Sequence, residues 1–312
     1  MRLLGFDIGG TKCAAVTAKW ENGVLTLLDR VECPTDHTRS GEGMLCELFS
    51  LAEGIVGERP DAIGISCGGP LDAACGVVLS PPNLPTWRNV PAVALAEARF
   101  GAPAHLENDA NASALAEWRF GAGRGYQNLV FLTFGTGLGA GLILDGHLYR
   151  GTNGNAGEVG HIRLSENGPI GFGKCGSFEG FCSGGGIARL AWQKAKEAPQ
   201  RPSFIKADMG QEELTTKDIA EAARRGDTVA CEVFRIAGER LGAGLAVLID
   251  VLNPEVIVIG GVFMRCRDLL LPPCERVLRS EALACSLDAC RILPAALGEE
   301  IGDYAALGAA LL

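Results

Sequence analysis

The sequence lacks the features of a secreted, membrane-spanning or nucleic-acid-binding protein. No apolar run reaches the length of a membrane span, and residues 1–12 have neither the basic nor the apolar region of a signal peptide. The net charge is −9 and no run of Lys or Arg occurs, which disfavours nucleic acids and anionic membranes as partners. None of the 12 cysteines forms a Cys-x-x-Cys pair, so most are predicted to be reduced, buried apolar residues. We therefore expect a cytoplasmic protein.

What the sequence does contain is clustered glycine. The chain has 43 Gly in 312 residues, with 47% hydrophobic and 21% charged residues, as in an ordinary globular protein. This length suits two lobes. Gly clusters mark tight turns at which the backbone approaches a ligand closely.

Two of these clusters follow apolar strands in a matching way. Residues 2–7 form a predicted strand that enters the turn DIGGT at 7–11, and residues 128–134 form one that enters GTGLG at 135–139. Each turn leads into a further strand. Aligning Asp7 with Thr133 superimposes the two strand–turn–strand units, which predicts a duplicated lobe.

Turns of this kind suit a nucleotide polyphosphate, because their backbone N–H groups can approach the phosphates closely. Thr11 and Thr136 can add hydroxyl donors. The carboxylate of Asp7 would be repelled by phosphate, so it makes sense there only through Mg²⁺ or a water bound to Mg²⁺.

The two turns match neither a P-loop nor a Rossmann fingerprint, since no Gly-x-x-x-x-Gly-Lys-Ser/Thr occurs and each turn leads into a strand. They resemble the β-hairpins that hold nucleotide phosphates in the sugar kinase/actin/Hsp70 superfamily. This resemblance implies an α/β protein with the two-lobed, actin-like ATPase (ribonuclease H-like) fold. We predict a smaller lobe of residues 1–116 with 298–312, and a larger lobe of residues 117–297.

Further motifs narrow the resemblance. The motifs DIGGTK, ENDAN, GTGLG, GEVGH and NPE with a later GG begin at residues 7, 107, 135, 157 and 253. In this order, and over nearly the whole chain, they resemble the ROK family of bacterial sugar kinases and sugar-responsive repressors.

Asn108 and Asp109 stand at a predicted strand end, directly before a helix. Phosphoryl transfer to a sugar requires a base near the attacking hydroxyl and groups that hold that hydroxyl in line. The resemblance implies that Asp109 is the catalytic base and that Asn108 contacts the sugar. The alternative is that Asp109 caps a helix beginning near Ala110.

The remaining roles also come from the resemblance. It implies that the backbone at Gly68 comes close to the sugar. It implies sugar contacts for the side chains of Asn83, Asn108, Asp109, Glu158, His161 and Glu179. It implies nucleotide contacts for Asp7, Gly9, Gly10, Thr11, Lys12, Thr133, Gly135, Thr136, Gly137, Gly260 and Gly261. Lys12 can instead be a solvated surface residue, and the Gly pair can be a simple strand–helix turn.

One departure from the family concerns zinc. In typical members, the His of the Gly-His motif and three cysteines hold a structural zinc ion. With Glu179 as the anchor, the three cysteine positions fall on Ile170, Phe172 and Ser177, which cannot ligate zinc in the usual way. Cys175 and Cys182 are out of register. We expect no zinc, with Ile170 and Phe172 filling the space of the metal.

The sequence thus predicts an ATP- and Mg²⁺-dependent kinase for a hexose hydroxyl. The expected acceptor is the 6-hydroxyl of glucose or of a related aldohexose or N-acetylhexosamine; a fructokinase or N-acetylmannosamine kinase is the alternative. A sugar-responsive regulatory protein and an ATPase of the actin/Hsp70 type are the other classes. The first strand begins at Arg2, which disfavours an N-terminal helix-turn-helix. By analogy with the family we expect a homodimer.

Overall fold

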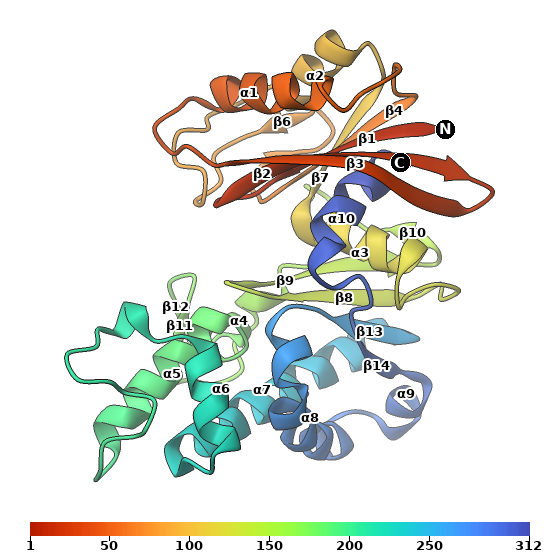
Figure 1. Cartoon of the computed structure of the whole chain (residues 1–312). Coiled ribbons are helices and arrows are strands. Elements are labelled where there is room, and N and C mark those ends of the chain that lie inside the picture. Colours follow the sequence, from red (N-terminus) through yellow and green to blue (C-terminus); the bar gives the residue numbers. More distant parts are fainter. The chain divides into compact units, whose positions relative to one another are not determined.

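A computed structural model describes residues 1–312, which divide into two compact units (Figure 1). Unit 1 consists of Met1–Gly125, Leu148–Asn155 and Ala296–Leu312, and unit 2 of Tyr126–His147 and Ala156–Ala295. The ranges 1–116 with 298–312 and 117–297 remain a prediction about domains. The division of the structure places residues 117–125, 148–155 and 296–297 in unit 1. None of the helices combines the length and the apolar character that a membrane span requires.

Unit 1 is built on a five-stranded sheet with the order β3-β2-β1-β4-β7. Strand β1 pairs antiparallel with β2 and parallel with β4. The strands are β1 (Arg2–Ile8), β2 (Lys12–Glu21), β3 (Val24–Pro34), β4 (Ala62–Cys67) and β7 (Ala104–Asn108), with a small separate pair β5 (Leu71–Asp72) and β6 (Val77–Val78). The helices are α1 (Gly41–Glu53), α2 (Ala92–Phe100), α3 (Asp109–Phe120) and α10 (Ile301–Ala309), preceded by the 3₁₀ turn η3 (Gly298–Glu300).

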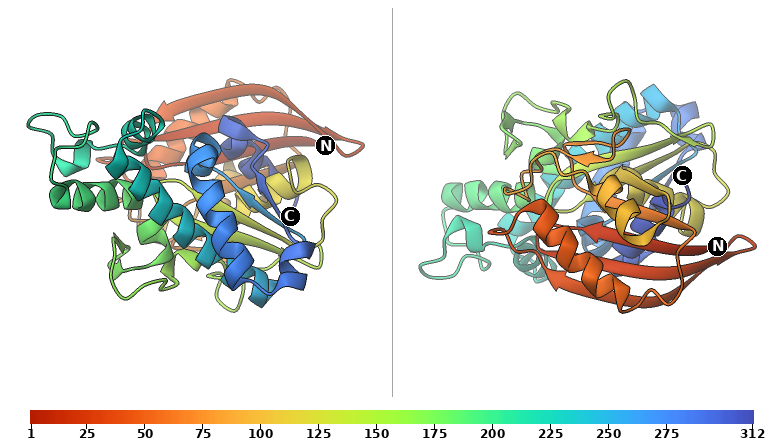
Figure 2. Two further views of the ribbon diagram at one scale, coloured as in Figure 1. Left: turned by 90° about the horizontal axis from the view of Figure 1, so that it is seen from below. Right: turned by 90° about the horizontal axis from the view of Figure 1, so that it is seen from above.

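The alternation of side chains along β1 assigns the two faces of this sheet. Leu4, Phe6 and Ile8 belong to a buried cluster shared with α1 and α2, whereas Leu3 packs with α10. Figure 2, seen from above, shows α1 over the strands of unit 1. A Cβ at Gly64 would overlap the carbonyl oxygen of Ala306, so α10 comes close to the sheet only because this residue is Gly. Asp7 lies on this α10 face.

Unit 2 repeats the plan with the sheet order β10-β9-β8-β13-β14. Its strands are β8 (Leu129–Phe134), β9 (Leu138–Leu144), β10 (His147–Leu148), β13 (Val256–Ile259) and β14 (Arg291–Pro294), with a small hairpin of β11 (Ile170–Gly171) and β12 (Lys174–Cys175). The helices are α4 (Phe178–Phe181), α5 (Gly184–Glu197), α6 (Thr216–Arg224), α7 (Thr228–Leu252), α8 (Val262–Glu281) and α9 (Ala284–Ala289); η1 (Val159–His161) and η2 (Gln211–Glu213) are 3₁₀ turns.

The two sheets have the same strand order along the chain, which confirms the predicted duplicated lobe. Strand β8 pairs antiparallel with β9 and parallel with β13, as β1 does with β2 and β4. Asp7 and Thr133 occupy matching positions, two residues before Gly9 and Gly135. Each Gly-rich turn therefore joins the first two strands of its own sheet.

Helix α7 shows how local residues fix the two ends of an element. The Asp227 side chain caps its start by accepting hydrogen bonds from Val229 N and Ala230 N, both at 3.0 Å. The helix ends at Asn253, whose φ of 45° is left-handed, and Pro254 follows. Helix α1 spans Gly41–Glu53, because Ser40 caps its start and Gly54 follows its end.

Candidate active site

The junction of β7 and α3 positions the predicted base. Asn108 is the N-cap of α3, and its Oδ1 accepts hydrogen bonds from Ala110 N at 3.0 Å and Asn111 N at 3.4 Å. Asp109 is the first helical residue, and its Oδ1 accepts from Ala110 N at 2.9 Å. The main capping role that was considered for Asp109 thus belongs to Asn108.

The environment of Asp109 changes its proton affinity. Its side chain remains accessible to solvent, yet desolvation by surrounding protein raises the pKa of the carboxyl group. Hydrogen bonds from the backbone and from Asn108 oppose this rise without cancelling it. A carboxylate with a raised pKa is a stronger base, which suits a group that must take a proton from a hydroxyl.

Beneath this junction lies Glu107, which is only 1% exposed. Its Oε1 accepts hydrogen bonds from Asn108 N at 3.0 Å and Asn111 Nδ2 at 2.9 Å, and its Oε2 accepts from Arg150 Nε at 2.8 Å. Glu107 therefore anchors the residues on both sides of Asp109. Glu107, Asn111 and Arg150 had no predicted role of their own; the available signal was an acidic residue directly before Asn108 and Asp109.

Two further predicted sugar residues of unit 1 come together with Asp109. A Cβ at Gly68 would lie 3.6 Å from both Oδ1 and Nδ2 of Asn83 and 3.8 Å from Oδ2 of Asp109. A Cβ at Gly69 would lie 3.4 Å from Asn108 Nδ2. Three loops that are separate in sequence therefore gather amide and carboxylate groups around the small residue Gly68.

The first Gly-rich turn packs against the same group. A Cβ at Gly10 would be 2.9 Å from the Cβ of Asn83, so only Gly fits at this position. Gly9 N donates a hydrogen bond to Lys12 O at 3.1 Å and closes the turn. Thr11 is exposed, and Lys12 Nζ pairs with Glu32 Oε2 at 3.0 Å on the surface.

Asp7, at the end of β1, lies among other carboxylates. Its pKa is raised to about 6, first by desolvation and then by the negative charges of Asp303 and Asp109, while Arg30 and Lys12 oppose the rise. The nearby Asp303 is already paired, because Arg30 Nε donates to both its oxygens at 3.1 and 2.8 Å. Negative charge at Asp7 is thus incompletely balanced by the protein.

This charge and the oxygen donors fit a hard cation such as Mg²⁺. No three His, Cys, Asp or Glu side chains lie close enough together to hold a metal ion by themselves. A cation beside Asp7 would therefore keep water or phosphate oxygens among its ligands, as Mg²⁺ commonly does.

In unit 2, the second turn is closed by Gly135 N, which donates to Gly137 O at 3.1 Å. Thr136 is exposed at its tip. The hydroxyl of Thr133 is used inside the strand pair, where it accepts from Gly139 N at 2.9 Å and contacts Gly139 O at 3.3 Å.

The predicted sugar residues of unit 2 adjoin this turn. Glu179 Oε2 accepts a hydrogen bond from Leu138 N at 3.1 Å, and a Cβ at Gly137 would be 2.8 Å from the same oxygen. A Cβ at Gly160 would lie 3.2 Å from Glu179 Cβ. Glu158 and His161 stand on either side of Gly160 in η1 and are both exposed. Their side chains are thus available to a ligand.

The Gly pair after β13 also lies beside the second turn. Gly261 has a φ of 62°, and a Cβ there would overlap Phe134 O and lie 3.3 Å from Gly135 N. On the other side, Gly184 N donates to Gly135 O at 2.8 Å, and Thr216 Oγ1 donates to Gly184 O at 2.9 Å. Neither Gly184 nor Thr216 was predicted to belong to the site; the Gly run that starts α5 was the available signal.

The residues at the zinc positions of the family do not form a ligand set. Ile170 and Phe172 are 54% and 73% exposed, so the expectation that they fill the space of the metal is wrong. Ser177 is buried and caps α4 by accepting from Gly180 N at 3.1 Å. The thiols of Cys175 and Cys182 are bonded to carbonyl oxygens, of Gly168 at 3.1 Å and Ala237 at 3.4 Å.

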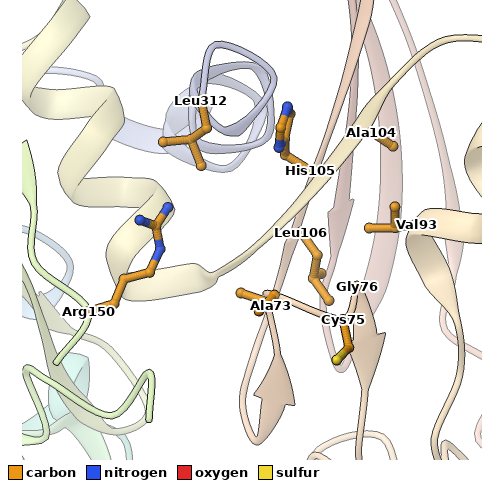
Figure 3. A pocket seen from close by; sticks show the side chains of 10 residues that line it. Ala73, Cys75, Gly76, Val93, Ala104, His105, Leu106, Arg150 and Leu312 are labelled. Atoms are coloured by element: carbon orange, nitrogen blue, oxygen red, sulfur yellow. The ribbon is translucent and has the colours of Figure 1, made fainter. Parts of the chain in front are cut away.

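Unit 1 also contains a cavity of about 420 Å³ (Figure 3). None of the predicted sugar or nucleotide residues lines it. Its connection to the site is Arg150, whose guanidinium group stands at the cavity and binds Glu107. The lining residues are Ala73, Ala74, Cys75, Gly76, Val93, Ala104, His105, Leu106, Arg150 and Leu312.

The paired sheets with their Gly-rich turns, and an aspartate at a strand–helix junction, define a protein of the sugar kinase/actin/Hsp70 superfamily. The sequence matches the model of the ROK family over residues 3–312, and the chain belongs to this family. It is 37% identical over 277 residues to a glucokinase from Streptomyces coelicolor, with 88% of this chain and 86% of that protein covered.

Solved structures agree with this assignment. A ROK family glucokinase from Streptomyces griseus, in complex with glucose and AMPPNP, superimposes with a TM-score of 0.77 at 35% identity, covering 99% of this chain and 98% of that one. A ROK family transcriptional regulator, a homologue of the E. coli MLC protein, gives a TM-score of 0.86 at 26% identity, covering 99% of this chain and 78% of that one. Because its relatives include these glucokinases, the chain is identified as a sugar kinase.

Proposed function

We propose that this kinase transfers the γ-phosphoryl group of ATP to the 6-hydroxyl of glucose or of a related aldohexose or N-acetylhexosamine, with Asp109 as general base. The observation that carries the proposal is the convergence of Gly68, Asn83 and Asn108 on Asp109. A sugar has many hydroxyl groups, and fixed amide and carboxylate groups are what holds such a ligand. Glucose and a nucleotide analogue are bound by the S. griseus relative.

In this mechanism the sugar hydroxyl oxygen attacks the γ-phosphorus while Asp109 accepts the proton, and ADP leaves. The side-chain oxygen of Asn108 is used in capping α3, and its amide nitrogen hydrogen-bonds Asp109, which leaves the second N–H of Nδ2 to hold a sugar oxygen. Asn83 supplies a second amide. In unit 2, Glu158, His161 and Glu179 are the further candidates for sugar contacts.

The two turns supply the phosphate contacts. Backbone N–H groups of Gly10 and Thr11 in one turn, and of Thr136 and Gly137 in the other, would stabilise negative charge on the transferring group. Gly9 and Gly135 would allow the phosphates to approach closely, since their own N–H groups close the turns. Mg²⁺ held through water at Asp7 would neutralise phosphate charge when bound. Lys12 and Thr133 are secondary candidates, because Lys12 pairs with Glu32 and the Thr133 hydroxyl bonds Gly139. Gly260 and Gly261 would lie against the nucleoside.

Further expectations and two alternative functions accompany the proposal. We expect a cytoplasmic homodimer that binds no nucleic acid and contains no zinc. A fructokinase or N-acetylmannosamine kinase would use the same chemistry on another acceptor. A sugar-responsive regulator without kinase activity is the candidate from another class, favoured by the TM-score of 0.86 to the transcriptional regulator.

A screen for ADP release over hexoses and N-acetylhexosamines, in the presence of ATP and Mg²⁺, tests the proposal. We expect one aldohexose or N-acetylhexosamine to give rapid turnover. The substitution Asp109→Asn should lower kcat by about 10²- to 10⁴-fold, because the general base is lost, while sugar affinity stays within a few-fold. The control Asp29→Asn changes an exposed carboxylate of β3 and should have no effect. Sugar binding without any ADP release would identify a regulator, and near-normal turnover of Asp109→Asn would refute the base.

A further inference from the structure

The turn between β11 and β12 carries an aromatic residue in an unfavourable place. Ile170 pairs with Cys175 and Gly171 with Lys174, which leaves a two-residue loop of Phe172 and Gly173. Both loop residues have positive φ, 42° and 76°. Such loops favour Asn or Gly, because a bulky side chain is strained in the left-handed region. The turn itself therefore gives no reason for Phe at this position.

Burial gives no reason either. Phe172 is 73% exposed, the largest exposed fraction among the bulky apolar side chains together with Val251. An aromatic ring in this position contributes little to folding through the hydrophobic effect, which scales with the apolar area removed from water. A strained residue without a packing role points to function.

The one ring contact of Phe172 is with His161. The two ring centroids are 5.2 Å apart and the planes meet at 81°, which is the edge-to-face arrangement that aromatic pairs prefer. The same hairpin also holds the backbone of His161, because Lys174 Nζ donates to His161 O at 2.6 Å. The hairpin thus fixes both the main chain and the ring of this residue.

We infer that Phe172 is a positioning residue that orients the imidazole of His161 for the sugar. The imidazole of His161 is otherwise exposed, so the edge-to-face contact with Phe172 is what restricts its orientation. The inference rests on the proposed sugar contact of His161. An unrestrained imidazole would sample several rotamers, and binding would then have to select one of them.

The variant Phe172→Asn separates positioning from folding. Asn is better suited to positive φ than Phe, so the melting temperature should stay the same or rise. Sugar affinity, measured by calorimetry without ATP, should fall by about 3- to 10-fold, the range expected for an aromatic pair, whereas the KM for ATP should not change. Phe172→Tyr should keep affinity. The matched control Ile170→Asn removes an exposed apolar side chain from the same hairpin and should leave affinity unchanged.

A double-substitution cycle tests whether Phe172 acts through His161. In a His161→Ala background, Phe172→Asn should have no further effect on sugar affinity. An equal loss in both backgrounds, or no loss in the wild-type background, would overturn the inference. NMR supplies a readout that needs no sugar: Phe172→Asn should shift the imidazole proton signals of His161, because the ring current of Phe172 is removed. If that shift occurs but no sugar binds to the wild type, the proposed function fails while the contact stands; no shift overturns the positioning role.

Discussion

The contact between Arg150 and Glu107 leads to a sharp prediction about how unit 1 holds Asp109, the proposed base. Glu107 is 1% exposed and Arg150 is 39% exposed, and their ion pair spans 2.8 Å. The substitution Arg150→Met keeps most of the aliphatic length and removes the charge. It leaves a buried carboxylate with only the two neutral donors from Asn108 and Asn111.

Breaking a fully buried ion pair by removing one partner costs about 3–5 kcal/mol. Arg150 is partly exposed, so water can replace it in part, and the remaining donors keep some stabilisation. We therefore expect a loss of about 2–3 kcal/mol, which corresponds to a fall of about 4–12 °C in melting temperature for a unit of this size. Scanning calorimetry of the whole chain would measure it. The kcat should fall too, because Asn108 and Asn111 on both sides of Asp109 lose a fixed anchor.

The control is Arg99→Met, which removes an Arg–Glu53 pair with two hydrogen bonds of 2.7 and 2.8 Å at the surface. Exposed pairs contribute about 0–1 kcal/mol, so this change should lower the melting temperature by no more than a few degrees. The double variant Glu107→Gln with Arg150→Met removes the buried charge as well and should recover part of the stability. If Arg150→Met melts no lower than Arg99→Met, Glu107 does not depend on its partner.

Two further predictions concern Asp7 and zinc. The pKa of Asp7 is about 6 in the fold against 3.8 as the ordinary value, so the folded state binds more protons between these pH values and loses stability as pH rises through them. Without nucleotide, the Asp7→Asn variant should therefore be more stable than the wild type at pH 8, by about 2–3 kcal/mol, and should melt at a higher temperature. This difference should disappear near pH 4, and a constant difference between pH 4 and 8 would contradict the reasoning. The variant should nevertheless lack kinase activity. Metal analysis of the purified protein should find far less than one zinc per chain, and a zinc-selective chelator should leave activity unchanged; stoichiometric zinc would refute the prediction.

The Gly-rich turns and the duplicated sheets could be predicted because their signals are local. A short apolar strand, a Gly pair and a second strand lie within about a dozen residues, so no distant contact is needed to recognise them. The motif around Asp109 is equally compact. Which of Asn108 and Asp109 is the N-cap of α3 could not be predicted, because this depends on backbone angles. Asn108 has a φ of −62° and a ψ of 143°, which is the extended geometry of a cap.

What escaped prediction depends on contacts between distant segments. The role of Glu107 requires Arg150, which is 43 residues away and belongs to a segment that returns to unit 1. The sequence around Glu107 and around Arg150 gives no indication that the two residues are in contact. Helix α5 escaped for a local reason, since it begins with three consecutive Gly, residues that disfavour a helix interior and that only packing makes tolerable.

The zinc positions show how a correct alignment can still give a wrong environment. Apolar side chains at the positions of Cys ligands were expected to pack inward, because apolar residues usually gain by burial. That expectation did not include the register of the hairpin. The pairing of Gly171 with Lys174 leaves only Phe172 and Gly173 for the loop, so Phe172 is placed at its exposed end. There its ring contacts the imidazole of His161. Phe172, at one of these cysteine positions, is therefore better understood from its contact with His161 than from whether it fills the space of a metal ion.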